Sequence, residues 1–275
     1  MFVSTTGIIA RPTSVPPFIG ILDVYPNAAT AYSFRKLRSA YSGSCIRVRR
    51  SSDNTEQDIG FVSNVLDTAS LLSFVGAGDG FVTTWYDQSG NNLNSTQSIA
   101  VNQPQIVSSG VIVKTSGNIT SMSCLNKDLS NTQTNTATQA TFIASECLST
   151  GSGSSFMVPF GTIGSNSSSI YAGSVANGSG STASSNFGTP SFFVNDLSIG
   201  STRGNLFSAY AINNETVFNI INGGSTTSNR FLQYTTSGFS GNYKVFEVII
   251  YNTNQSSNRT GINTNINNFY SIYPW

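Results

Sequence analysis

The chain has 275 residues and a formal net charge of +1, and only 9% of its residues are charged, against about 25% in an average soluble protein. With so weak a field, nucleic acid, anionic membranes and acidic substrates are not expected partners. The sequence contains no histidine, which excludes Ser-His-Asp triads, Cys-His dyads and histidine-based metal sites.

The cysteines Cys45, Cys124 and Cys147 are an odd number with no CxxC spacing. This usage predicts free, mostly buried thiols and synthesis in a reducing cytosol. The N-terminal stretch lacks the basic start and apolar core of a signal peptide, and no stretch approaches the roughly 20 apolar residues of a membrane span. No cofactor is predicted, and calcium held by oxygen-rich loops stays open.

The chain is predicted to divide into an arm and a body. Residues 1–20 carry Pro12, Pro16 and Pro17 among small residues, which favours an extended arm that orders by lying on another surface. Residues 21–275 are predicted to form one β-rich domain.

The first part of this body is predicted to alternate helices and strands. Ala31, Phe34, Leu37 and Tyr41 recur at steps of three and four, which predicts a helix over residues 27–42. The alternation in "CIRVRR" predicts a half-exposed strand. The segment "LDTASLLSFVG" predicts a short capped helix that stops at its final glycine, and "FVTTWY" predicts the strand after it.

A basic cluster lies between Arg35 and Arg50 and is followed at once by Asp53, Glu56 and Asp58. Because charge runs are usually paired or solvated, local ion pairs are predicted here. A docking surface for an acidic partner protein is the alternative.

From Val101 onward, short apolar runs are separated by Gly, Ser and Asn, as in "QIVSSGVIVKT", "ATFIASE", "SIYAGSV", "SFFVND", "NLFSAYAI", "TVFNIING" and "KVFEVIIYN". Many brief strands with frequent turn signals are typical of a sandwich or jelly roll. At the end, Ile262, Ile266, Phe269 and Tyr273 share one helical face, which predicts a closing helix docked on the sandwich.

The acidic residues limit the chemistry that is possible. Only twelve are present, and glycoside hydrolysis needs two of them facing each other, at about 5 Å for retention or about 6.5–9.5 Å for inversion of configuration. Sequence spacing does not test that distance, so a glycosidase stays open.

The stretch "WYDQSGNN" supports two interpretations. Asp87 is well suited to an Asx turn in which Gly90 takes a positive φ. Alternatively, a sugar stacks on Trp85 while Asp87 and Gln88 bind its hydroxyl groups.

Two stretches, "AYSFRKLRSAYSGSCIRVRRSSDNTEQDIGF" and "WYDQSGNNLNSTQ", resemble the N-terminal part of the alpha-L-arabinofuranosidase B catalytic domain. The segment "KVFEVIIYNTNQSSNRTGINTNINNFYSIY" resembles the last strand and closing helix of laminin-G-like jelly rolls. The resemblance implies a mainly β fold: a concanavalin-A-like jelly-roll β-sandwich with a few short helices and an extended N-terminal arm.

The catalytic residues implied by that resemblance do not carry over. Pro159 and Gly164 in "PFGTIG" stand where the family has an Asp and its nucleophilic Glu, and Thr235 or Thr236 stands where it has the general acid. None of these side chains donates the proton that a glycosidase needs. Alternatively, Glu146 or Asp196 takes the place of a missing catalytic carboxylate from a different position in the chain.

A retained scaffold without its catalytic carboxylates predicts a non-enzymatic bacteriophage virion protein, either a capsid decoration (cement) subunit or a head or tail fibre subunit. The expected partners are other virion proteins bound through the arm, further copies of the chain and a possible host-surface glycan, and the expected location is the virion. A carbohydrate-binding lectin-like module and an arabinofuranosidase-like glycoside hydrolase are the two alternatives.

Overall fold

A computed structural model of the chain describes residues 16–125, 127–133, 136–149, 157–162, 165–172, 180, 189–209, 213–223, 230–231 and 242–274. Its strands are β1 (Thr30–Ser33), β2 (Ile46–Arg50), β3 (Glu56–Ile59), β4 (Phe61–Val62), β5 (Val65–Leu66), β6 (Gly80–Trp85), β7 (Ser95–Thr96), β8 (Gln105–Ser108), β9 (Val111–Ile112), β10 (Met122–Ser123), β11 (Leu129–Ser130), β12 (Ala140–Ser149), β13 (Met157–Thr162), β14 (Ser165–Ala172), β15 (Ser191–Val194), β16 (Leu197–Ile199), β17 (Glu215–Ile221), β18 (Arg230–Phe231) and β19 (Asn242–Tyr251). The helices are α1 (Ile21–Val24), α2 (Thr68–Val75), α3 (Arg203–Ala209) and α4 (Arg259–Tyr270).

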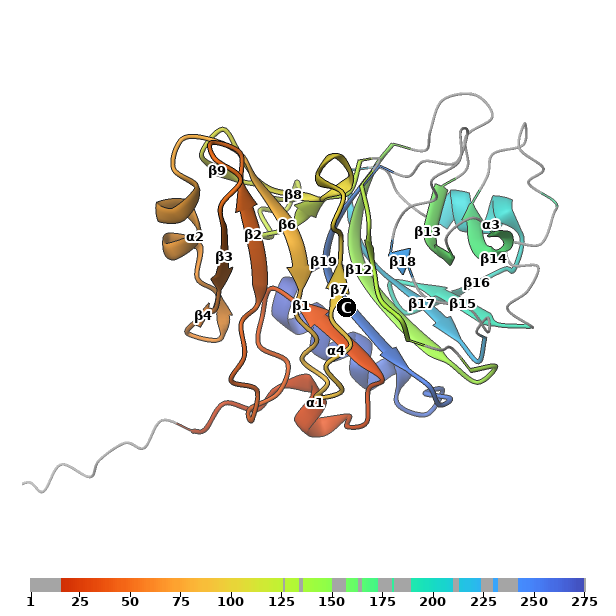
Figure 1. The fold of residues 1–275 in the computed structure, drawn as a ribbon. Helices are drawn as coiled ribbons and strands as arrows, with labels where there is room; N and C mark the ends of the chain where they lie inside the picture. The colour runs from red at the N-terminus through yellow and green to blue at the C-terminus, as the bar shows by residue number, and fades with distance from the viewer. Residues whose placement is uncertain are drawn as a thin grey trace, which may run out of the picture.

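These strands form two layers, which stand on the left and in the centre of Figure 1. In the first layer β2 pairs with β3 and β6, and β6 pairs with β7 and β8. In the second layer β19 pairs with β1 and β12, and the order continues through β17 to β15. All of these pairings are antiparallel, and β10 joins the layers by pairing with both β8 and β19.

Aromatic side chains fill the space between the layers. The ring of Trp85 stacks on that of Phe34 at 5.2 Å and lies 5.6 Å from that of Tyr32, and all three residues are buried. The predicted mainly β sandwich with a few short helices is therefore confirmed, and its finer assignment to the laminin-G-like jelly rolls stays a prediction.

The helix predicted over residues 27–42 is wrong. This segment contains β1, and its backbone groups bond distant parts of the chain instead of the preceding turn: the amide of Lys36 bonds the carbonyl of Asn64, and that of Leu37 bonds the Gln88 side chain. Burial of both faces of β1 removes the alternation that marks a strand in a sequence.

The segment "NLFSAYAI" also differs from expectation, because α3 occupies most of it where a strand was predicted. Thr202, the residue before this helix, and Asn205, in its first turn, bond each other's backbone amides, and such reciprocal capping favours a helix start. The predicted strands β2 and β6 and the helix α2 are confirmed, with Asp67 capping α2 at its start. Residues 1–15 of the predicted arm lie outside the described residues, and the boundary at residue 20 stays a prediction.

The closing helix is present as α4, but its buried face differs from the predicted one. Ile262 and Ile266 are buried as expected, whereas Phe269 is 47% exposed and Tyr273 lies beyond the helix end. Asn263 takes part in the buried face, because α4 covers polar groups on β17 as well as apolar ones.

The three cysteines are buried and not joined in disulfides, as predicted. Burial raises the pKa of the Cys45 and Cys124 thiols, so neither is a reactive thiolate at neutral pH. Over the described ranges, none of the helices combines the length and apolar character needed to cross a lipid bilayer.

Candidate functional site

Two glutamates lie directly opposite each other on neighbouring strands. Glu146 of β12 pairs with Glu215 of β17 in the antiparallel register, and Lys244 of β19 stands on the other side of Glu146. Like charges placed directly opposite on a sheet are destabilising. A local conflict of this kind marks a place where function or a compensating contact must be sought.

The compensating contacts come from the turn after β9 and from β19. The backbone amide of Ser116 donates to Glu146 Oε1 at 3.0 Å, and that of Gly117 donates to Glu215 Oε1 at 2.5 Å. Lys244 Nζ lies 3.3 Å from Glu146 Oε2. Gly117 permits this approach, because a Cβ atom there would come within 2.6 Å of the Glu215 carboxylate.

The electrostatic environment keeps Glu215 ionised. Partial burial acts to raise the pKa of Glu215, but hydrogen bonds from the Thr115 side chain and the Gly117 amide outweigh it and hold the pKa below its ordinary value. Glu146 lies deeper, at 1% exposure. The pair therefore offers one ionised, partly accessible carboxylate beside an enclosed one.

The remaining acids have structural partners. All twelve lie in the described part of the chain, and in its strand registers the glutamate pair (Glu146 and Glu215) is the one place where two carboxylates stand opposite each other. The other partnerships are Asp23 with Gly20 and Ser39, Asp53 with Arg50, Glu56 and Asp58 with Arg47, Asp67 with Ser70, Asp79 with Ser109, Asp87 with Ala31, Asp128 with Gln97, Asp196 with Arg259, and Glu247 with Arg35.

The local ion pairs predicted for the basic cluster are confirmed at Arg47 and Arg50. Arg35 behaves differently, because it forms a buried bidentate pair with Glu247 of β19, far away in the sequence. Within the described ranges, no group of three or more Cys, Asp or Glu side chains is arranged to hold a metal ion.

The residues proposed to hold a glycan at the end of β6 have enclosed side chains. Trp85 and Gln88 are 0% exposed and Asp87 is 2% exposed. The backbone amide of Ser89 donates to Asp87 and Gly90 has a positive φ, so the predicted Asx turn is confirmed; the amide of Ala31 donates to the same carboxylate. These three side chains build the loop that follows them, and their direct contact with a sugar stays a prediction.

Two carboxylates that the sequence suggested as substitutes fall in different places. Glu146 belongs to the glutamate pair, whereas Asp196 pairs with Arg259 and Asn263 of α4. Gly164, Thr235 and Thr236 lie outside the described residues. Glu215 was missed, because nothing in the sequence marks the register that sets it opposite Glu146.

The family model and the solved structures that match this chain all come from arabinofuranosidases. The family model for the alpha-L-arabinofuranosidase B catalytic domain matches residues 23–123. An arabinofuranosidase structure complexed with arabinofuranosyl-alpha-1,2-xylobiose is 14% identical with a TM-score of 0.53, and the match covers 90% of this chain and 64% of that one. No curated protein matches the chain.

Two further structures have the same fold. A GH54 α-L-arabinofuranosidase soaked with a cyclic sulfate inhibitor is 15% identical with a TM-score of 0.50. A mutant of a GH54 α-L-arabinofuranosidase soaked with 4-nitrophenyl α-L-arabinofuranoside is 13% identical with a TM-score of 0.53. Each match covers 90% of this chain and 65% of the neighbour, so the chain spans less than two thirds of these neighbours' length.

These comparisons contradict the expectation of a non-enzymatic phage structural protein. The matched family model and each of the three structures named above belong to arabinofuranosidases, and none of them is a capsid or fibre subunit. The lectin alternative receives no better support. The expected arm contacts, homo-oligomer and location stay predictions.

Proposed function

We propose that the chain is an arabinofuranosidase-like glycoside hydrolase domain. The observation that carries this proposal is the fold shared with arabinofuranosidases over 90% of the chain, together with the family model that matches residues 23–123. The chain spans only part of those enzymes, so the proposal concerns a hydrolase domain that acts on a glycoside with a small furanose sugar at its end.

The glutamate pair supplies the two carboxylates that this chemistry requires. Side chains directly opposite on antiparallel strands have Cβ atoms about 4.5–5.5 Å apart. The two side chains therefore leave the same face of the sheet, and we assign them the closer arrangement used in retaining hydrolysis, in which the carboxyl groups are about 5–5.5 Å apart. Glu215 is assigned as nucleophile, because its lowered pKa keeps it ionised. Glu146, the second carboxylate of the pair, is assigned as the acid and base through Oε2, the oxygen that the Ser116 amide does not bind.

The two steps balance as follows. The Glu215 carboxylate bonds to the anomeric carbon while the bond from that carbon to the leaving oxygen breaks, and the leaving oxygen takes a proton from Glu146. A water molecule then gives a proton back to Glu146 and displaces the Glu215 carboxylate, which releases the sugar with its configuration retained.

The test is release of 4-nitrophenol from 4-nitrophenyl α-L-arabinofuranoside. The parent protein is expected to turn over this substrate, and Glu215→Gln to lower the rate by at least about a thousandfold, because a Gln side chain forms no glycosyl ester. Glu56→Gln is the matched control, since it removes an exposed acid of the other layer and should leave the rate unchanged.

The outcomes test the hydrolase activity separately from the assignment of Glu215 as nucleophile. Turnover that survives Glu215→Gln would move the chemistry to another of the twelve acids while keeping the hydrolase. Absence of turnover by the parent protein on aryl furanosides of several configurations, at high protein concentration, would reject the hydrolase itself.

A further inference from the structure

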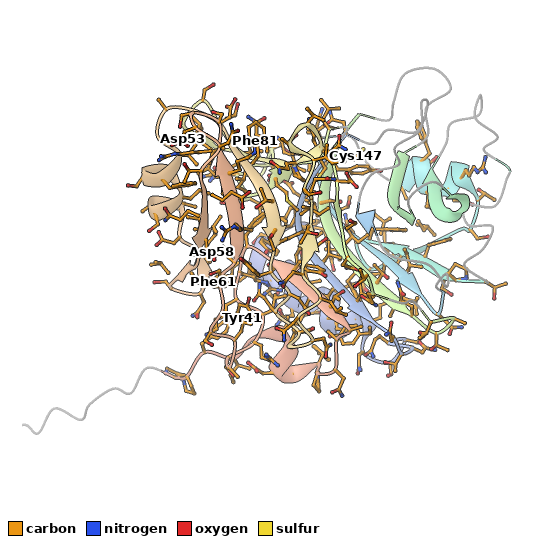
Figure 2. All side chains as sticks on the ribbon, in the orientation of Figure 1. Tyr41, Asp53, Asp58, Phe61, Phe81 and Cys147 are labelled. Carbon is orange, nitrogen blue, oxygen red and sulfur yellow. The ribbon has the colours of Figure 1, made fainter. Side chains whose placement is uncertain are left out.

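A polar groove lies at the end of β6, on a different part of the molecule from the glutamate pair. Its volume is about 460 Å³, and its walls include Arg38, Tyr41, Asp58, Tyr86, Asn92 and Asn94. Figure 2 shows Asp58 on the left with Tyr41 below it, whereas Cys147, the neighbour of Glu146 in the chain, lies higher and to the right. The groove falls in the size range of small-molecule sites, about 300–1,000 Å³.

The loops that form the groove are fixed from beneath. Gln88 donates to the carbonyls of Ser33 and Arg35 and accepts from the Leu37 amide, which ties the end of β6 to the segment after β1. Asp87 accepts from the amide of Leu93, which closes the loop that bears Asn92 and Asn94. Enclosed polar residues therefore hold both walls in place before any ligand arrives.

Gly90 sets the position of one wall. Its φ of +101° is a conformation that side chains disfavour, and a Cβ atom there would meet the Arg38 guanidinium at 2.7 Å. Arg38 Nη1 donates to the Ser89 carbonyl at 3.1 Å, so the guanidinium lies over the turn. Its Nε atom is buried and has no hydrogen-bond partner among the described residues.

The aromatic members are also fixed by hydrogen bonds. Tyr86 Oη donates to Asp58 Oδ1 at 2.7 Å, and Tyr41 Oη donates to the Ser44 carbonyl at 2.8 Å. Both rings are partly exposed. Rings whose orientation is set in advance lose little entropy when they pack against the face of a ligand.

The charges of the groove nearly cancel. Asp58 lies 3.2 Å from Arg47 Nη1, a guanidinium that it shares with Glu56, and the walls also include the cation of Arg38 and the enclosed carboxylate of Asp87. Neither a strong anion nor a strong cation is favoured by such a surface. What it offers is aromatic faces, amides and hydroxyl groups, which suit an uncharged ligand rich in hydroxyl groups.

From this geometry we propose that the groove is a binding site for a neutral glycan chain, separate from the glutamate pair. That the ligand is a glycan rests on the proposed function. The position of the binding site and the lack of charge on its ligand rest on the groove itself. In this proposal the groove holds the main chain of a polysaccharide while a side branch of the same molecule is cut at the glutamate pair.

The test uses arabinofuranosyl-α-1,2-xylobiose as the probe and Glu215→Gln as the background, so that the probe is not consumed. Calorimetric titration is expected to detect binding. Tyr86→Ala should raise the dissociation constant by about tenfold, since a buried aromatic contact carries energy of that order. Asn92→Gly, which keeps the positive φ of that residue, should weaken binding without disturbing the fold.

Phe81→Ala is the matched control, because Phe81 is a partly exposed aromatic residue at the other end of β6 (Figure 2). It should leave the dissociation constant unchanged. If all variants bind the probe equally, or if the Glu215→Gln protein does not bind it, the groove is not the glycan-binding site.

The groove and the hydrolase fail in different ways. Binding that depends on Tyr86 without any turnover by the parent protein would keep the groove and reject the hydrolase. If the parent protein turns over the substrate but Tyr86→Ala and Asn92→Gly leave the dissociation constant unchanged, the hydrolase proposal stands and the groove proposal is rejected.

Discussion

At the scale of single residues, the enclosed acids act chiefly as organisers of backbone. Asp87 is 2% exposed and accepts from three backbone amides, those of Ala31, Ser89 and Leu93. It therefore connects β1, the end of β6 and the loop that walls the groove. Its carboxylate would have to leave these donors unpaired in order to bind a sugar directly.

The first prediction concerns this residue. Asp87→Ala should lower the free energy of unfolding by about 3 kcal/mol, because it leaves buried amides without an acceptor. Asp67→Ala, which removes the exposed cap of α2, should cost clearly less. Urea unfolding followed by fluorescence measures both, and equal losses would show that Asp87 has no special structural role.

The second prediction concerns the buried ion pair. Arg35 Nε and Nη2 each donate to Glu247 at 2.7 Å, and both side chains are almost fully enclosed. Arg35→Met alone should cost about 3–5 kcal/mol, because it strands a buried carboxylate, whereas Arg35→Met with Glu247→Leu should cost much less. A double-mutant cycle measured by thermal unfolding tests this coupling, and stability losses that simply add would contradict it.

At the scale of elements, α4 is docked by amides as well as by apolar packing. Asn263 Nδ2 donates to Asn219 Oδ1 at 2.7 Å, Asn219 Nδ2 donates back to Asn263 Oδ1 at 3.0 Å, and both residues are 0% exposed. The ring of Tyr270 packs edge-on against Phe246 of β19. Residues that count as polar in a sequence thus form part of the helix–sheet interface.

The third prediction follows from this exchange of amide bonds. Asn263→Leu should cost about 2 kcal/mol, since Asn219 is then buried without its partner. Changing Asn219 to Leu as well should recover part of the loss, because two apolar groups then meet. Thermal melts of the two variants decide the matter, and a double variant that is less stable than the single one would contradict it.

The fourth prediction concerns the turn that binds the glutamate pair. The pKa of Glu215 is lower in the folded chain than its ordinary value of 4.5, so the folded form binds fewer protons than the unfolded one when the pH falls through this range. Its contribution to stability is present above that value and is lost as the pH falls through the folded pKa. Because the group is partly exposed and screened, we expect about 1 kcal/mol or less.

Glu215→Gln should therefore be less stable than the parent at neutral pH, and the difference should shrink as the pH falls from 4.5 through the folded pKa of Glu215. Urea titrations at a series of pH values measure the difference. A gap that widens on acidification would show that the Gly117 amide does not favour the ionised form.

The same scale shows what the sequence could predict. The strands β2 and β6 and the helix α2 carry local signals, alternation in the strands and the Asp67 cap in the helix, and they were predicted correctly. Residues 27–42 carry a helical spacing that their partners override, because β1 is enclosed by β19 on one side and by the first layer's core on its face. Local patterns fail where burial comes from distant segments.

At the scale of the whole molecule, the sandwich brings together residues that no local pattern connects. The glutamate pair arises because β12 and β17 are neighbours in the second layer, and the groove arises because the end of β6 meets the loop after β1 (Figure 1). The fold class could be predicted from strand rhythm and from the resemblance, and Glu146 could be named because acids are few. Glu215 required the register itself.

The most direct test of the central claim is to label the nucleophile with an arabinofuranose-configured cyclic sulfate, the class of inhibitor soaked into one of the structural neighbours. A nucleophilic carboxylate opens such a ring, forming an ester with the sugar carbon and leaving a sulfate monoester on the neighbouring oxygen. Peptide mapping by mass spectrometry is predicted to find one adduct, on Glu215. An adduct on any other acid, or none under conditions in which the aryl arabinofuranoside is turned over, would contradict the glutamate pair as the site of hydrolysis.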